Sequence, residues 1–455
     1  MSEKRQKGLS LTELSAIAIG QVIGAGLITT TGLAIAKTGR SVWIAYALAV
    51  FFGFVWILPT IFFSSIARYK GGAFTVVKSL IGDLPAGLYG LFWIPMIASF
   101  ALVGTGTGSY LHAVFPGISV KMGGIIVTTI FYVLNMFGVH LMAKVEKPLT
   151  GLLIVGLLAF AIFGLTKLQP GTFDFSTSDF FLGGGSGFFA GLILLVYSTS
   201  GQALVQAFDW QAENPRRDLP KAIIIATLAI FVLYVSVSFV AGNVLPVETV
   251  AGQPLTYAAK AIFGDVGALI FIFLGPVMAL ITTMNSGWAA LSAPTLGAIR
   301  NGWLPKGIAK TNKYGAPYII YTVEYVVAMM PMVIGVSLSS ITSYTVMVQR
   351  ICGTILCIAM FALPKKYPDA WKKSSLHMPN GVYYAISIFA TITQIAAVVI
   401  SAINLGWTGF LLNIGVVIVF AVYGVLRYKS GKTNSKAIAL IGDDADDPEL
   451  IAKYN

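Results

Sequence analysis

Charged residues are scarce in this chain. Only 11% of the 455 residues are Asp, Glu, Lys or Arg, whereas about a quarter of the residues of a soluble domain are charged. Apolar residues make up 56% of the chain, and the mean hydropathy is +0.82. This composition excludes an ordinary soluble enzyme and favours a protein embedded in a membrane.

Histidine and cysteine are also rare, with three and two residues. Cys352 and Cys357 fall in one predicted helix, where their Cα atoms are too far apart for a disulfide. The histidines lie at predicted helix ends, far apart in the sequence, and so form no metal or nucleophile cluster: His112, His140 and His377. We therefore expect no enzyme activity and no bound cofactor, apart from a possible coupling ion.

Long apolar runs are abundant. Twelve of them reach the roughly 20 residues that a bilayer-spanning helix needs. We therefore predict an all-α membrane protein with twelve transmembrane helices at 11–37, 41–67, 84–114, 122–142, 148–168, 187–211, 220–246, 265–299, 317–338, 340–363, 380–404 and 407–427.

Basic residues are distributed unevenly along these predicted helices. The net charge of +12 is 30 basic minus 18 acidic residues. Basic residues collect in the segments on one side of the predicted bundle, including both termini, and few fall on the other side: Lys37, Arg40, Lys121, Lys167 and Lys260. Cytoplasmic segments carry such an excess. We expect both termini in the cytoplasm, a multi-pass protein of the plasma membrane, and no nucleic-acid partner.

The first predicted helix contains a stretch that suits a helix poorly. Gly20–Gly26 places three glycines and Gln21 in mid-membrane. Glycine lets a helix unwind, and an unwound helix turns backbone N–H groups toward a cavity, where they suit a carboxylate. The alternative is a close-packing helix face, because Gly20 and Gly24 have the spacing of such a motif.

The sixth predicted helix contains a second polar stretch. Tyr197–Gln202 interrupts an apolar span with hydroxyls and a glycine, and its carbonyls suit an ammonium group. Breaks at the first and sixth positions correspond in two five-helix halves, as in inverted-repeat transporters with a midplane site. Each hydroxyl could instead bond its own helix backbone.

Several motifs resemble those of the amino acid–polyamine–organocation transporters. They are, in order along the chain, Val22–Leu27, Ala67–Ala73, Asn135–Val139, Glu213–Ile223, Arg300–Lys306 and Asn312–Pro317. The resemblance covers almost the whole chain, and Glu213–Ile223 is its most specific part.

The resemblance implies a leucine-transporter-type fold. Residues 1–10 would be a cytoplasmic N-terminus and 11–427 the transporter domain. That domain would contain inverted repeats at about 11–168 and 187–363 and accessory helices at about 380–427. Residues 428–455, with an acidic cluster, would be a solvated cytoplasmic tail.

The resemblance also implies the binding roles of individual residues. The amides of Gly24, Ala25 and Gly26 would hold the α-carboxylate of an amino acid. Carbonyls around Tyr197, Ser198 and Ser200, with Gly201 allowing the break, would hold its α-ammonium. Such a pocket suits a zwitterion without any charged side chain.

Two departures from the family pattern bear on substrate and coupling. Ala203 stands where members that handle cations often carry an acidic residue, which favours a neutral amino acid. Leu153 stands where many sodium-independent members place a lysine, so no ammonium group replaces a sodium ion there.

A candidate sodium site follows from the eighth predicted helix. Its hydroxyls Thr282 and Thr283 and the Ala279 carbonyl, with the carbonyls of Gly20 and Ile23 from the first helix, make five oxygens suited to a hard cation. The alternative is that both threonines bond carbonyls of their own helix.

Other interpretations stay open at this stage. Glu324 and Arg350 are charges inside predicted spans and either form a pair, lie near helix ends, or, for Arg350, face the substrate pathway. Ser99 and Thr105 are further candidates to line the pocket. Proton coupling, obligate exchange, polyamine or organocation transport, and a non-transporting amino acid sensor are the competing functions. The sequence does not indicate an oligomeric state.

Overall fold

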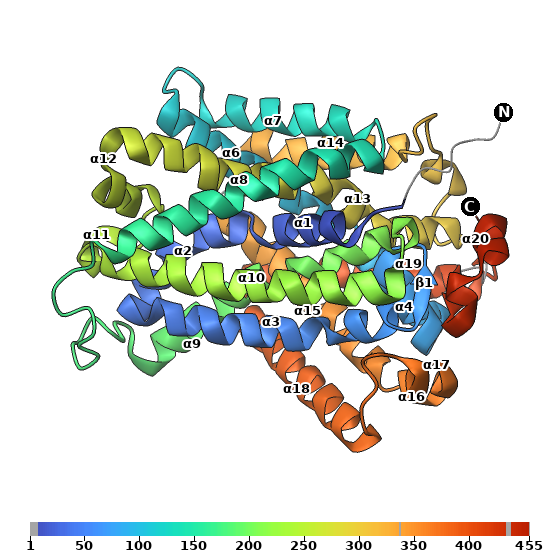
Figure 1. Cartoon of the computed structure of the whole chain (residues 1–455). Helices are drawn as coiled ribbons and strands as arrows, with labels where there is room; N and C mark the ends of the chain where they lie inside the picture. The colour runs from blue at the N-terminus through green and yellow to red at the C-terminus, as the bar shows by residue number, and fades with distance from the viewer. Residues whose placement is uncertain (1–7, 336–337, 434–437, 455) are drawn as a thin grey trace.

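The computed structural model describes residues 8–335, 338–433 and 438–454, except the side chains of Ala25, Thr29, Tyr197, 338–344, Asn404 and Thr408. Helices dominate this part of the chain (Figure 1). They are α1 (Leu11–Val22), α2 (Ala25–Thr38), α3 (Val42–Ser64), α4 (Gly72–Ile81), α5 (Asp83–Phe92), α6 (Ser99–Val114), α7 (Val120–Asn135), α8 (Val139–Leu165), α9 (Gly184–Val196), α10 (Pro215–Asn243), α11 (Val247–Val250), α12 (Thr256–Ile272), α13 (Met278–Arg300), α14 (Tyr318–Ile334), α15 (Leu338–Met360), α16 (Leu363–Lys366), α17 (Pro368–Lys373), α18 (Asn380–Asn404), α19 (Gly406–Lys429) and α20 (Pro448–Tyr454).

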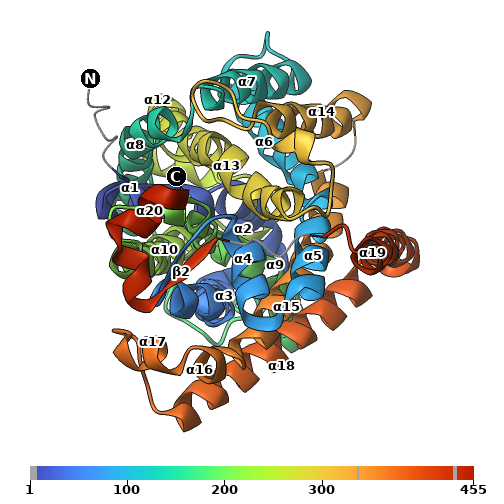
Figure 2. The same cartoon turned by 90° about the vertical axis from the view of Figure 1, so that its right-hand side faces the viewer.

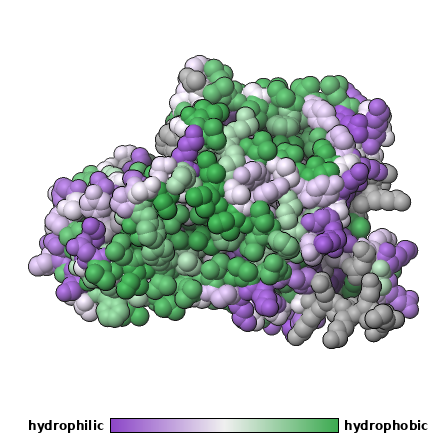
Figure 3. All heavy atoms as spheres, turned by 90° about the horizontal axis from the view of Figure 1, so that it is seen from above, coloured by the Kyte–Doolittle hydropathy of each residue, from purple (hydrophilic) through white to green (hydrophobic). Residues whose placement is uncertain are grey.

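The helices are suited to a membrane. Within the described residues, nine helical segments are long and apolar enough to cross a bilayer, and four shorter helices of 10–17 residues are also apolar. Many large apolar side chains face outward, and Figure 3 shows them over the middle of the molecule with polar residues toward its two ends. Lipid is the environment in which such a surface is stable. The chain is a multi-pass helical membrane protein, and the count of twelve crossings and the inverted repeat remain predictions.

Some helix boundaries differ from those predicted. The segment expected as one helix at 84–114 consists of α5, a 3₁₀ turn at Pro95–Ala98, and α6. The segment expected at 265–299 starts earlier, as α12, and passes through one π-helical stretch at Phe273–Val277 into α13. A helix expected to begin at 148 begins at Val139, because Pro148 is accommodated inside α8.

The two halves of the first interrupted helix lie at the centre of the bundle. Figure 1 shows α1 and α2 nearly in line between α8 and α10, and α1 also packs against α13. Every residue from Leu14 to Gly24 is buried. In contrast, α18 and α19 lie at the periphery, and much of α19 is exposed (Figure 2). The polar residues of Gly20–Gly26 are therefore inside the protein and not in contact with lipid.

The segment expected as a solvated tail is partly folded onto the helices: its apolar residues pack against them, whereas the side chains of Asp443, Asp444 and Glu449 are exposed. Strand β2 (Ala439–Ile441) pairs with β1 (Ala67–Tyr69) in an antiparallel two-stranded sheet, with Leu440 opposite Arg68. Leu440 and Ala445 are buried, and Asp446 pairs with Arg216 at 2.8 Å. Apolar residues between the acidic ones provide the packing that a fully solvated tail lacks.

Arg68 is expected to hold this tail in place. Its guanidinium donates to the carbonyls of Ala445 at 3.0 Å, Ala212 at 3.0 Å and Glu213 at 3.0 Å. The bond to Ala445 is the one that reaches the tail, and a hydrogen bond to a charged group is worth about 1.5–3 kcal/mol, so Arg68→Ala should destabilise the tail by about this amount. Hydrogen exchange of the 439–441 amides would measure this.

The control is Lys373→Ala, which removes an exposed ion pair of the same tail with Asp443. Exposed pairs contribute little, so the control should leave exchange almost unchanged. Equal protection of the β2 amides in Arg68→Ala and in the wild type would contradict the assignment.

Candidate functional site

The first interrupted helix breaks inside the predicted motif. α1 ends at Val22 and α2 begins at Ala25, with Ile23 at φ −84°, ψ 82° and Gly24 at φ −134°, ψ −141°. The first N–H groups of a helix have no partner within it and carry the positive end of the helix dipole. The N–H of Gly24, the first of the three predicted donors, instead bonds the Val22 carbonyl at 3.1 Å. The backbone of Ala25 and Gly26 therefore presents the donors suited to a carboxylate.

The second break lies in the segment predicted from Tyr197–Gln202. α9 ends at Val196 and is followed by two 3₁₀ segments, η3 (Tyr197–Thr199) and η4 (Gly201–Gln211), with Ser200 between them at φ −126°, ψ 4°. The Ser198 hydroxyl donates to the Leu195 carbonyl at 2.7 Å, so it bonds its own helix. The carbonyls of Ser198, Thr199 and Ser200 each accept one hydrogen bond already, so a ligand would meet their second lone pairs.

Tyr234 of α10 ties the two breaks together. Its hydroxyl lies 2.7 Å from the Val22 carbonyl and 3.2 Å from the Ser198 carbonyl. The Tyr234 ring is fully buried against Tyr46. One side chain therefore fixes the spacing between a carbonyl at the end of α1 and a carbonyl of η3.

Two glycines allow the broken segments to approach closely. A Cβ placed on Gly26 would overlap Cβ of Ser198 and lie 2.9 Å from its Cα. A Cβ on Gly201 would lie 2.6 Å from the Gln21 carbonyl. Real Cβ atoms do not tolerate such contacts, so both positions need glycine in this arrangement.

A cavity of about 100 Å³ lies between the breaks. Of the predicted substrate-binding residues, Gly24, Gly26, Ser198 and Gly201 line it, while Ser200 does not. The structure describes the backbone of Ala25 and Tyr197 but not their side chains. The remaining wall is mostly apolar or aromatic and includes Trp93, Met96, Phe100, Val103, Leu204 and Leu291.

The polar groups of this cavity are all neutral. Gln21, Ser99, Ser198, Thr283 and Gln349 line it, and none of the described lining residues is acidic or basic. Ser99 was expected here, whereas Thr105 lies outside the lining. The sequence did not predict Gln349 as a lining residue. It is a single amide beside Arg350 in an apolar run, and this pattern does not indicate which way its side chain faces. Its Oε1 is buried without a hydrogen-bond partner, which leaves an acceptor at the cavity wall.

Four of the five oxygens of the candidate sodium site gather beside this cavity, from Gly20, Ala279, Thr282 and Thr283. The Thr283 hydroxyl lies 2.9 Å from the Gly20 carbonyl and 3.1 Å from the Ala279 carbonyl. The Thr282 hydroxyl lies 3.0 Å from the Ala279 carbonyl and 3.4 Å from the Gly20 carbonyl. The bonds to Ala279 are the alternative interpretation, in which both threonines bond a carbonyl of their own helix. The bonds to Gly20, in contrast, join α13 to α1. Ile23, the fifth predicted ligand, is fully buried at the end of α1.

Sequence reasoning missed a buried carboxylate beside these oxygens. Glu146 of α8 is 0% exposed, and its Oε2 accepts a hydrogen bond from Asn285 Nδ2 at 2.6 Å. The residue lies between Lys144 and Lys147, before Pro148, and this surrounding sequence is typical of a loop. Only the earlier start of α8 places it within the bundle.

Glu324 and Arg350 do not form the pair that was one of the interpretations. Neither carboxyl oxygen of Glu324 has a hydrogen-bond partner within the described part of the chain, and Glu324 is fully buried on α14. The Arg350 guanidinium lies over the Trp56 ring at 4.6 Å. Arg350 does not line the cavity between the breaks.

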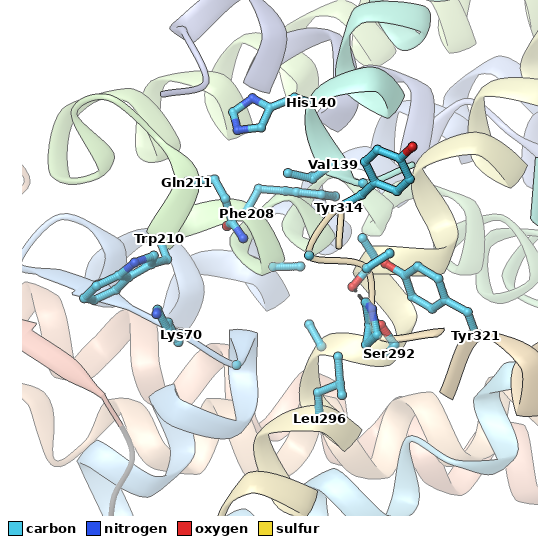
Figure 4. Close-up of a pocket in the computed structure, with 18 of the residues that line it drawn as sticks. Lys70, Val139, His140, Phe208, Trp210, Gln211, Ser292, Leu296, Tyr314 and Tyr321 are labelled. Atoms are coloured by element: carbon cyan, nitrogen blue, oxygen red, sulfur yellow. Dashed lines mark hydrogen bonds between the residues drawn. The ribbon is translucent and has the colours of Figure 1, made fainter. Parts of the chain in front are cut away.

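A second, larger cavity of about 510 Å³ lies toward the end of the bundle at which α1 begins and α20 is found. Figure 4 shows Lys70 and Trp210 on one side of it and Tyr314 and Tyr321 on the other. Burial, with a smaller effect of Arg300, lowers the pKa of Lys70 to about 8. Residues of η4 and α13 line both cavities. The large cavity lies further along each of these two elements than the small cavity does.

A central cavity between two broken helices, inside an apolar helical bundle, is the architecture of a membrane transport protein. The chain matches the amino acid permease family over residues 9–433 and belongs to this family. It is a transporter and not an enzyme.

Three relatives match over most of their length. The chain is 22% identical to the branched-chain amino acid permease BcaP of Bacillus subtilis (strain 168), over 91% of this chain and 92% of that protein. It is 24% identical to the D-serine/D-alanine/glycine transporter of Escherichia coli (strain K12), over 83% and 84%. It is 23% identical to the uncharacterized transporter YdgF of Bacillus subtilis (strain 168), over 93% and 96%.

Proposed function

We propose that this permease is a secondary active transporter of small neutral amino acids that works by alternating access. The observation that carries the proposal is the cavity between the two breaks, whose described lining side chains are all neutral. A charged substrate side chain would be buried there without a partner, at a high cost in free energy.

The zwitterionic part of the substrate is satisfied by backbone groups. The amides at the start of α2 would hold the α-carboxylate, and the carbonyls around Ser198 would hold the α-ammonium. The substrate side chain would meet Trp93, Phe100 and Val103. A cavity of about 100 Å³ is small beside the roughly 300–1,000 Å³ of drug-sized ligand pockets. Glycine, alanine and serine are the substrates of suitable size.

Two of the relatives support this class of substrate. Their names assign branched-chain amino acids to one and D-serine, D-alanine and glycine to the other. All of these are neutral amino acids.

The passage for release would run along η4 and α13. Leu204 and Leu291 line the small cavity, and Phe208 and Leu296 line the large one further along the same elements. We place the large cavity and both termini on the cytoplasmic side of the plasma membrane, because most basic residues lie on that side. Rocking of one helix set against the other would then open and close the substrate cavity.

Sodium is the coupling ion that we propose. The carbonyls of Gly20, Ile23 and Ala279 and the hydroxyls of Thr282 and Thr283 would hold it, and hard cations prefer such oxygens. Because these ligands come from both α1 and α13, the free energy of sodium binding would depend on how the two helices are arranged. This proposal is separate from that of the substrate class, and a failure of one would leave the other standing.

Substrate selectivity tests the proposal. Isothermal titration of the purified full-length protein should show binding of alanine, serine or glycine, and no measurable binding of lysine, glutamate or putrescine. The physical reason is that a buried charge costs several kcal/mol more than a methyl or hydroxyl group. Tighter binding of lysine or putrescine than of every neutral amino acid would contradict the proposed substrate class.

A further inference from the structure

Glu146 is a buried acid inside a membrane-spanning bundle without a basic partner among the described residues. It is 0% exposed, and its described contacts are neutral: Asn285 at 2.6 Å and Ser286 at 3.4 Å. An unpaired charge in such a place costs several kcal/mol. Charged groups buried at this cost inside membrane proteins mark ion or substrate pathways.

The carboxylate lies against the candidate sodium site. A Cβ placed on Gly20 would overlap Glu146 Oε1 and lie 3.0 Å from Cβ of Thr282. Gly20 and Thr282 are two of the five proposed sodium ligands. Oε1 therefore lies against the Cα of Gly20 and close to the Thr282 side chain, next to two of the residues that would supply the sodium ligands.

The hydrogen bonds leave this face of the carboxylate without a strong donor. Asn285 bonds the other oxygen, Oε2. The Ser286 hydroxyl has one hydrogen, and the Thr282 carbonyl at 2.9 Å is a closer acceptor than Oε1 at 3.4 Å. A cation among the neighbouring oxygens would supply the attraction that these donors do not.

A short chain of polar groups also joins Glu146 to the substrate cavity. Gln21 lines the cavity and donates a hydrogen bond from Nε2 to the Ser286 hydroxyl. Thr283 belongs both to the cavity wall and to the candidate sodium site. The substrate, the cation and the carboxylate would therefore act on the same short part of α1.

We propose that Glu146 is the anionic residue of the sodium site, and that it balances the charge of the cation held beside Gly20 and Thr282. The proposal rests on the proposed sodium coupling. It adds an acid to a set of ligands that otherwise consists of neutral oxygens. Glu146 then increases the affinity for the cation, because the carboxylate is already positioned and dehydrated before the cation arrives.

Sodium-dependent thermal stability of the full-length protein tests this assignment without measuring transport. A ligand at free concentration c that binds only the folded state stabilises it by RT ln(1 + c/Kd), so Tm rises with ligand concentration and rises less when the affinity is weaker. The wild type should show a rise in Tm when sodium chloride replaces choline chloride. Glu146→Gln keeps the size and polarity of the side chain and should weaken the apparent sodium affinity by about tenfold or more.

Glu324→Gln is the matched control, since it also neutralises a fully buried carboxyl but on α14, where neither oxygen has a hydrogen-bond partner among the described residues. It should keep the wild-type sodium response. Glu146→Asp retains the charge with a shorter reach, and its response should lie between those of Glu146→Gln and the wild type. This second variant keeps the proposal testable if Glu146→Gln does not fold.

Two results would overturn the proposal. One is an apparent sodium affinity in Glu146→Gln equal to that of the wild type. The other is a wild-type protein whose Tm responds to pH but not to sodium, which would place a proton at Glu146. Counterflow of alanine in the same preparations keeps this outcome separate from the substrate proposal, because counterflow without a sodium response leaves neutral amino acid transport intact.

Discussion

Gly26→Val is expected to weaken amino acid binding severely. The new Cβ would overlap Cβ of Ser198 and lie 2.9 Å from its Cα, at the contact between α2 and η3. Overpacking of a tight contact costs about 1–3 kcal/mol, and each 1.4 kcal/mol is tenfold in affinity. The added methyl groups would also fill the space assigned to the α-carboxylate. We expect a loss on the order of a hundredfold, measured by isothermal titration with the best neutral substrate.

Gly151→Val is the control for the glycine itself. Gly151 lies on the exposed face of α8, where an added Cβ would have no neighbour within 4 Å. This variant should bind substrate as the wild type does. Size-exclusion chromatography of both variants separates lost binding from lost folding. A Gly26→Val protein that is monodisperse and binds with wild-type affinity would contradict the position of the carboxylate site.

Replacing both Thr282 and Thr283 with valine should erase any stimulation by sodium. Valine keeps the shape of threonine but removes the two hydroxyls that lie within 3.4 Å of the Gly20 carbonyl. Counterflow of alanine without sodium should remain, because only Thr283 lines the substrate cavity and its hydroxyl points to the backbone of α1 and α13. The measurement is uptake of labelled alanine under an inward sodium gradient and in choline.

Thr295→Val is the matched control on the same helix. Its hydroxyl bonds the Gly90 carbonyl at 3.3 Å, away from α1. Sodium stimulation should be unchanged in this variant. Stimulation that persists in the double variant would show that the hydroxyls serve only to bond helix carbonyls, as they do with Ala279.

The breaks in the two central helices could be located from the sequence, because their cause is local. Gly24 and Gly26 have no side chains, which lets two segments meet closely. The polar stretch after Val196 would be unstable against lipid, so it is expected to face the interior of the protein. Such features depend on a few neighbouring residues. For the same reason, the apolar runs predicted most helices to within a few residues.

Features that depend on tertiary contacts could not be read in this way. Glu146 follows Lys144 and precedes Lys147 and Pro148, so its burial against Gly20 depends on the packing of α8 beside α1 and α13. The pairing of β2 with β1 joins segments at opposite ends of the chain. The acidic cluster around Asp443 predicted a solvated segment, but Leu440 and Ala445 in the same segment are buried.

Counterflow in proteoliposomes tests the central claim most directly. Vesicles that contain the full-length protein and are preloaded with unlabelled alanine should accumulate labelled alanine, and Gly26→Val vesicles should not. Preloading with lysine should give no accumulation, because the cavity lacks an acidic partner for its ammonium group. Absence of counterflow for every neutral amino acid in folded wild-type protein, or counterflow of lysine alone, would contradict the proposed function.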